Sequence, residues 1–179
     1  MRQLPQPHQF SGVLASLQVA LKDAGGLNPA FLSPGQAGGV LLALERVQAQ
    51  VAELGLRVMA SGPARVLAEE TGARDVAAWL AANAALDVRE AHARLRLAQA
   101  LERHEATRTA LAEGRLGVAQ ARVITQSLDD LAEAASADPE SGIDAGVDAG
   151  ILARGEAHLV GLAAAHGPRE LRRLAAHLI

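Results

Sequence analysis

Apolar residues recur every three or four positions along most of the chain, a spacing typical of amphipathic helices. The longest such pattern lies in "VLLALERVQAQVAELGLRVMA", where Ser33 is the predicted N-cap and Pro34 takes the first helical position. Its apolar stripe comprises Leu41, Leu44, Val47, Val51, Leu54 and Val58. "SGP" at 61–63 predicts an interruption, because proline lacks an amide donor and clashes with the preceding turn. The next helix, "ARVLAEE", is expected to end with Gly72 as its cap.

Two helix-turn-helix-like units are predicted in the middle of the chain. The first joins "RDVAAWLAANA" to "VREAHARLRLAQALERH", and the second joins "ATRTALAEG" to "VAQARVITQSLDDLAEAA". At an offset of 30 residues both contain Leu-x-Val-x-[Glu/Gln]-Ala, starting at Leu86 and Leu116. "HGPRELRRLAAHL" is a weaker third copy, so duplication is one interpretation and chance similarity of alanine-rich helices is the other. Ala85 occupies the turn position where a DNA-binding helix-turn-helix favours glycine.

The remaining segments define the predicted domain organisation. Residues 1–32 are expected to be a flexible N-terminus with a short amphipathic helix, and 33–179 a helical domain. "SADPESGIDAGVDAG" lacks apolar periodicity and predicts a solvated linker at about 136–150. Two closing helices follow, the second opened by Pro168. Because the last helix stops at 178–179 without a cap or polar tail, the chain is expected to be truncated before a further domain.

Composition supports an all-α fold: a multi-helix bundle with helix-turn-helix-like hairpins and no sheet. Alanine and leucine favour helices and dominate the apolar half of the chain, whereas the strand-favouring β-branched and aromatic residues are scarce. Trp79, the single tryptophan, is expected to be the largest side chain of the core. The absence of cysteine excludes disulfides and thiol chemistry. No apolar run reaches the roughly 18 residues of a membrane span, so we expect a cytoplasmic protein with no membrane contact.

Charge is unevenly distributed along the chain, although the net charge is only −3. Between residues 89 and 122, seven arginines outnumber four glutamates. Between residues 126 and 156, eight acidic side chains accompany a single arginine, Arg154. A mildly basic segment is therefore followed by a strongly acidic one.

One helix in the basic segment carries a strip of polar donors beside its apolar face. We call it the arginine strip, and it consists of Arg89, His92, Arg96, Gln99 and Arg103. Arginine forks suit both phosphate oxygens and guanine edges, so the strip is a candidate nucleic-acid-binding surface. The alternative is a solvated face whose arginines pair with Glu102, Glu105 or the acidic segment beyond residue 126. Arg94 lies nearer the apolar face, alongside Val88, Ala91, Leu95 and Ala98, and is expected to make a structural contact.

No motif of known catalytic chemistry is present. The chain lacks a P-loop, a dinucleotide fingerprint and Gly-x-Ser-x-Gly. The adjacent carboxylates of Asp129 and Asp130 point about 100° apart on a helix and do not converge on one bond. His158 and His166 are eight residues apart, which is not the spacing of metal ligands on a helix, and the tandem "DAG" does not match a calcium loop. We therefore expect no catalytic residue, no metal site and no cofactor in this chain.

The region from about residue 33 to 179 resembles the domain-of-unknown-function 222 family, the N-terminal helical region of the 13E12-repeat proteins of high-GC bacteria. The resemblance rests on "AAWLAANAALDVREAHARLRLAQAL", "ALAEGRLGVAQARVI" and "LAAAHGPRELRRLAAHL". Members commonly carry an HNH endonuclease domain after this region, and the helical region itself has no assigned activity. The resemblance implies that any divalent metal belongs to an HNH domain outside this sequence, which has no predicted β-hairpin and only two asparagines.

Two hypotheses for function follow. In the first, the chain is a non-catalytic module of an HNH-endonuclease-associated protein that positions or regulates nucleic-acid cleavage, with DNA bound along the arginine strip. In the second, it is a protein-interaction or dimerisation scaffold without nucleic-acid contact. Its partner would be a second copy or the missing C-terminal nuclease domain, bound through the apolar stripe of residues 41–58.

Overall fold

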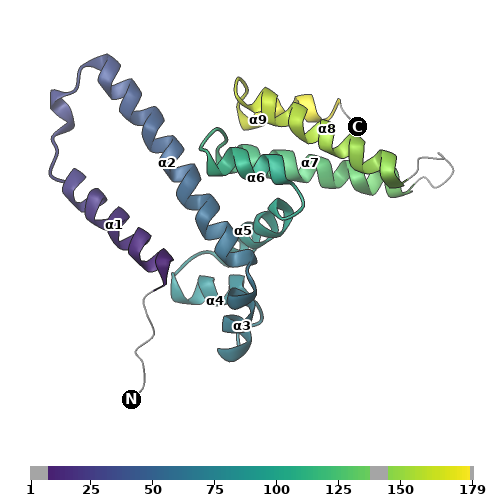
Figure 1. The fold of residues 1–179 in the computed structure, drawn as a ribbon, viewed down its shortest axis with the longest axis horizontal. Coiled ribbons are helices and arrows are strands. Elements are labelled where there is room, and N and C mark those ends of the chain that lie inside the picture. Colours follow the sequence, from purple (N-terminus) through teal and green to yellow (C-terminus); the bar gives the residue numbers. More distant parts are fainter. Residues whose placement is uncertain (1–7, 138–144, 178–179) are drawn as a thin grey trace. The chain divides into compact units, whose positions relative to one another are not determined.

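A computed structural model describes residues 8–137 and 145–177, and in these ranges it contains helices and no strand (Figure 1). The all-α prediction is therefore confirmed for this part of the chain. The helices are α1 (Gln9–Ala24), the 3-10 turn η1 (Pro29–Phe31), α2 (Pro34–Ala60), α3 (Gly62–Glu70), α4 (Val76–Asn83), α5 (Val88–Leu101), α6 (Glu105–Ala112), α7 (Val118–Ala137), α8 (Ala145–Ala163) and α9 (Pro168–Ala175). None of the helices described is long and apolar enough to cross a membrane.

The contacts divide the chain into two units, residues 1–41 and 42–179. In the first unit, α1 buries none of its residues, and Phe31 of η1 is almost fully exposed. The start of α2 is fixed by a capping box, in which the Ser33 hydroxyl accepts from the Gln36 amide at 3.3 Å. The Gln36 side chain accepts from the Ser33 amide at 2.9 Å. This confirms Ser33 as the N-cap.

The core of the second unit is built around α7, which packs against α5, α6, α8 and α9 (Figure 1). Its largest cluster is filled by leucine, isoleucine, valine and alanine: Ala110, Leu116, Val123, Ile124, Leu128, Leu159, Ala163, Leu171 and Ala175. A second cluster joins Ala49 and Leu56 of α2 to residues of α5, α6 and α7. The helix-turn-helix-like units are the hairpins α4–α5 and α6–α7.

Left-handed residues end three of the helices. Gly72 and Gly114 both have φ +70°, and Ala85 has φ 49°. After each of them the next amide donates to a carbonyl five residues back, as at Leu86 to Ala81 (3.2 Å), which is the pattern of a Schellman cap. Gly72 is thus confirmed as a cap. Ala85 adopts the conformation that glycine would favour, so the α4–α5 turn keeps its geometry without glycine.

Three predictions of detail were wrong. Helix occupies both ends of the predicted linker at 136–150, since α7 continues to Ala137 and α8 begins at Ala145; residues 138–144 lie outside the described part. Helix propagates at little cost from a packed segment, even through a glycine-containing sequence. Trp79 is only partly buried, and the buried residues of α4 are instead Val76, Ala77 and Ala81. Val88 is 58% exposed rather than part of the apolar face of α5.

Candidate functional site

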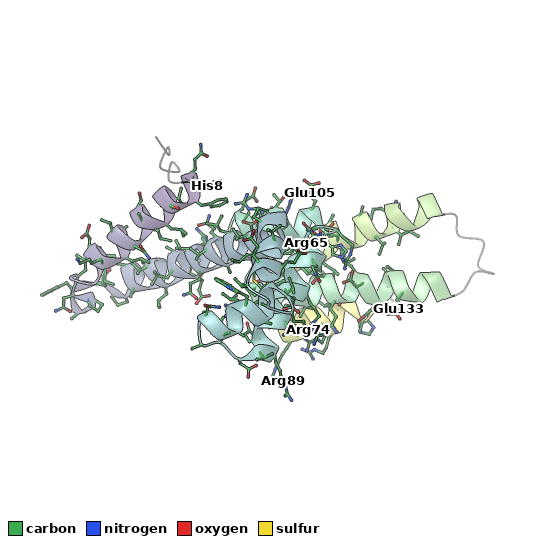
Figure 2. All side chains as sticks on the ribbon, turned by 90° about the horizontal axis from the view of Figure 1, so that it is seen from below. His8, Arg65, Arg74, Arg89, Glu105 and Glu133 are labelled. Carbon is green, nitrogen blue, oxygen red and sulfur yellow. The ribbon has the colours of Figure 1, made fainter. Side chains whose placement is uncertain are left out.

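The arginine strip lies on α5, and two of its arginines are available for a ligand. Arg89 and Arg96 are exposed, and neither forms an ion pair within the described ranges. Figure 2 shows the Arg89 side chain extending away from the ribbon. Gln99 is also exposed. These three side chains keep their donors free for solvent or for a partner.

His92, by contrast, makes two polar contacts within the fold. Its Nδ1 lies 2.8 Å from the carbonyl oxygen of Val88, and its Nε2 lies 3.2 Å from the Asp75 carboxylate. The same carboxylate accepts from the Ala78 amide at 2.8 Å and caps α4. That amide hydrogen bond, together with His92, holds the pKa of Asp75 below its usual value. His92 therefore joins the start of α5 to the start of α4.

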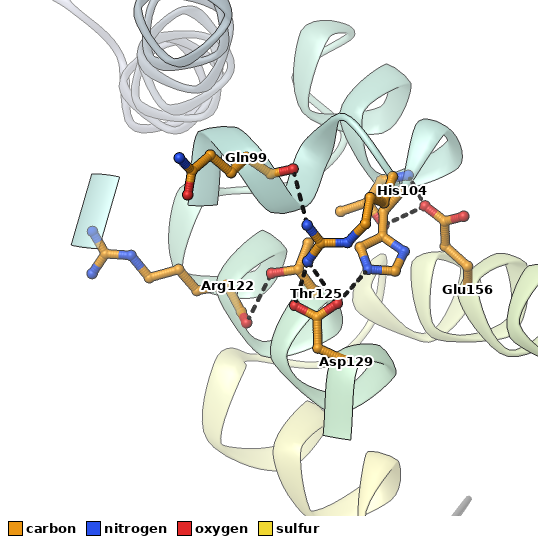
Figure 3. Close-up of polar contacts among 8 residues, drawn as sticks. Gln99, His104, Arg122, Thr125, Asp129 and Glu156 are labelled. Atoms are coloured by element: carbon orange, nitrogen blue, oxygen red, sulfur yellow. Dashed lines mark hydrogen bonds and ion pairs between the residues drawn. The ribbon is translucent and has the colours of Figure 1, made fainter. Parts of the chain in front are cut away.

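Arg103 is neutralised by a residue of α7. Its Nη2 donates to both carboxylate oxygens of Asp129 at 2.9 Å. The Nε2 of His104, which is buried, lies 3.2 Å from one of the same oxygens (Figure 3). Asp129 belongs to the acidic segment, so for Arg103 the solvated-face alternative, with pairing to acids beyond residue 126, is confirmed. Within the described residues, Arg89, Arg96 and Gln99 are thus the members of the arginine strip whose side chains form no hydrogen bond or ion pair.

Arg94 makes the structural contact expected of it. Its Nε donates to Glu90 at 3.1 Å, and the same glutamate oxygen accepts from Arg122 of α7 at 3.0 Å. The hydrogen bonds from Arg94 and then Arg122 hold the pKa of Glu90 below its usual value. Because Glu90 bridges α5 and α7, this cluster fixes the packing of the two helices.

The buried carboxylate of Glu156 is also engaged in structure. It accepts from the Thr107 amide at 2.7 Å and from the Thr107 hydroxyl at 2.8 Å. His104, the N-cap residue of α6, makes no side-chain cap bond, so Glu156 of α8 satisfies the first turn of α6 instead. The carboxylate of Glu156 therefore caps α6 from α8.

Histidine and acidic side chains do not gather into a metal site in the part of the chain that the structure describes. That part contains no group of three or more histidine and acidic side chains placed to hold a metal ion. An open groove of about 500 Å3 runs between α2 and α6. Among its lining residues, Glu53 lies 3.5 Å from Arg57 of the same helix.

One face of α2 carries a row of exposed or partly exposed apolar side chains, which we call the α2 seam. It consists of Val40, Leu44, Val47, Val51, Leu54 and Val58, spaced alternately by four and three residues. Leu54 is partly buried, and the other five are each between 39% and 46% exposed. The predicted stripe is therefore real but shifted: Val40 belongs to it, whereas Leu41, 64% exposed, lies beside it.

The buried face of α2 is on the opposite side. It consists of Ala49, Glu53 and Leu56, and it packs on α5, α6 and α7. With successive residues about 100° apart, its mean direction lies roughly 170° from that of the seam. The helix thus has one apolar face inside the fold and a second that faces solvent.

No family model matches the chain, and neither a curated protein nor a solved structure is similar to it. The resemblance to the domain-of-unknown-function 222 family accordingly stays a prediction.

Proposed function

We propose that this chain is a helical scaffold that associates with a second copy of itself through the α2 seam. The observation that carries the proposal is the second apolar face of α2, which runs for about 27 Å from Val40 to Val58 at 1.5 Å per residue. A surface helix of a monomer buries its apolar face and exposes polar residues. A continuous exposed apolar stripe is instead typical of a protein-binding surface.

The spacing of the seam supports a helix as the bound element. Steps of four and three residues average 3.5 residues, the repeat with which helices pair in coiled coils. The near absence of charge beside the seam supports a second copy as the partner. The positions flanking the seam carry Leu41, Ala43, Gln48, Gln50, Gly55 and Arg57, and the one charge among them is already paired with Glu53. Two copies therefore meet without like-charge repulsion.

We expect the full chain to have twice the mass of one copy in light scattering coupled to size-exclusion chromatography. The variant Leu44→Glu/Leu54→Glu should have the mass of a single copy, because two carboxylates would be buried without partners. Gly39→Glu/Leu42→Glu adds the same charge to exposed positions of α2 outside the seam and should remain dimeric. A parent chain that is monomeric at every concentration would overturn the proposed function.

Nucleic-acid contact is the second candidate, because Arg89 and Arg96 are exposed and unpaired in the described structure. Both project from α5, the second helix of a helix-turn-helix-like hairpin, where recognition helices carry their contacts. The family resemblance adds that such a module would accompany an HNH nuclease domain and position or regulate its cleavage. We rank this candidate second because two residues of the arginine strip already contact acidic side chains of the same chain: His92 contacts Asp75, and Arg103 contacts Asp129.

A duplex-DNA titration over a range of salt concentrations tests the second candidate. If both arginines contact phosphates, Arg89→Gln/Arg96→Gln should lower the slope of log affinity against log salt by about two. Arg103→Gln serves as the control and should leave the slope unchanged, since Arg103 is already paired with Asp129. Equal slopes for the parent and the double variant would exclude the two arginines as phosphate contacts.

A further inference from the structure

We infer that two copies pair through the α2 seam in antiparallel orientation, about a two-fold axis that crosses the seam at the level of residue 49 along the helix. This inference rests on the proposed self-association and adds its geometry. It is carried by the order of residues in the seam together with the exposure of that face.

The seam is a palindrome in both spacing and residue type. Read from either end it is Val, Leu, Val, Val, Leu, Val, with steps of four, three, four, three and four residues. Its members are placed in pairs at equal distances from residue 49: Val40 with Val58, Leu44 with Leu54, and Val47 with Val51. An antiparallel two-fold axis at this point brings each side chain against its own type in the other copy.

The match of sizes matters because paired helices interlock side chains as knobs into holes. In the heptad repeat of the seam, Leu44 and Val51 take a positions, and Val47 and Leu54 take d positions. In the antiparallel register every layer joins an a position to a d position, as antiparallel heptads require: Leu44 with Leu54, and Val51 with Val47. A valine layer at each end, a leucine layer next to it and two valine layers at the centre give a repeating and well-filled interface.

A parallel pair fits the sequence less well. With Leu44, Val51 and Val58 at a positions, the d positions are Val40, Val47 and Leu54. Parallel two-stranded coils favour β-branched residues at a and leucine at d. Two of the three d positions here are valine, so a parallel pair would have the disfavoured residue in most of its d layers.

Helix α1 of the same chain is too short to be the sole occupant of the seam. It has 16 residues, about 24 Å, whereas α2 has 27, about 40 Å. A helix of 16 residues laid along α2 from its first residue would reach no further than about residue 49. Val51, Leu54 and Val58 would remain uncovered. An antiparallel second copy covers both ends of the seam equally.

Disulfide trapping in the full chain tests the orientation, since the protein has no cysteine of its own. Val40→Cys/Val58→Cys should form a covalent dimer on oxidation, because these positions face each other across the proposed axis. The two cysteines of one copy lie about 27 Å apart along the helix and cannot join, given that a disulfide needs Cα atoms within about 7 Å. A second double variant, Leu44→Cys/Leu54→Cys, places the cysteines in the next layer. It should also crosslink, so that poor alignment of the first cysteine pair does not decide the result.

The single variant Val40→Cys separates the possible results. We expect it to stay uncrosslinked while remaining dimeric in light scattering, because its two copies would be about 27 Å apart. Efficient crosslinking of Val40→Cys would show a parallel pair and overturn the inference while the proposed self-association stands. A dimer in which neither double variant crosslinks would overturn the register. A parent chain that is monomeric would overturn the proposed self-association as well.

Discussion

Replacing Glu156 with alanine is expected to lower the free energy of unfolding by about 3 kcal/mol, the typical consequence of leaving buried donors without an acceptor. The Glu156 carboxylate accepts from both the amide and the hydroxyl of Thr107, and Thr107 is fully buried. His104, the N-cap residue, makes no side-chain cap bond, so the acceptor shown for the first turn of α6 is Glu156. For a chain of this size the midpoint of thermal unfolding should fall by roughly 6–12 °C.

The loss of stability should depend on the hydrogen-bond acceptor at position 156 and not on its charge alone. Glu156→Gln keeps one oxygen for the Thr107 donors and should lose less than half of what Glu156→Ala loses. Glu70→Ala removes an exposed glutamate at the end of α3 and should leave the midpoint within about 1 °C. Thermal unfolding followed by circular dichroism measures all three. Equal losses for the alanine and glutamine variants would show that Glu156 does not act by capping α6.

Helix boundaries could be predicted from the sequence wherever a local signal sets them. Ser33 and Gln36 form their capping box within four residues of each other, and Gly72 ends α3 because glycine tolerates a positive φ. The interruption at 61–63 likewise needs only the proline. The linker failed as a prediction because its glycines carry no information about how far packing extends the neighbouring helices.

The partners of the arginine strip could not be predicted, since they come from distant parts of the chain. Arg103 meets Asp129, 26 residues away, and His92 meets Asp75, 17 residues away. The acidic segment beyond residue 126 indicated that a counter-charge existed, but only tertiary packing selects which arginine it neutralises. Glu156 gave no signal at all, because its partner Thr107 lies 49 residues away.

For the α2 seam, the apolar residues could be predicted from their periodicity in the sequence. Only the structure shows that this face stays exposed. In one sequence, the stripe of α2 and the face formed by Ala49 and Leu56 are both apolar, and either could be the core face. The packing on α5, α6 and α7 selects the smaller face, because alanine permits the close approach of helices. The larger side chains are then left for a partner.

The assignment of the two α2 faces can be tested through Gly114, in the turn between α6 and α7. An added Cβ at Gly114 would lie 3.0 Å from both the Cβ and the carbonyl oxygen of Arg46, so the turn lies directly against α2. Gly114→Ala combines the strain of a positive φ with this clash and is expected to cost about 3 kcal/mol. Chemical denaturation measures the loss.

Gly72 provides a matched control, because it has the same φ of +70° and no atom within 4 Å of the added Cβ. Gly72→Ala should therefore report the backbone strain alone, about 1 kcal/mol. The difference between the two variants measures the contact of the α6–α7 turn with α2. If the two losses were equal, that turn would not rest on α2, and the face of α2 opposite the seam would no longer be its inner face.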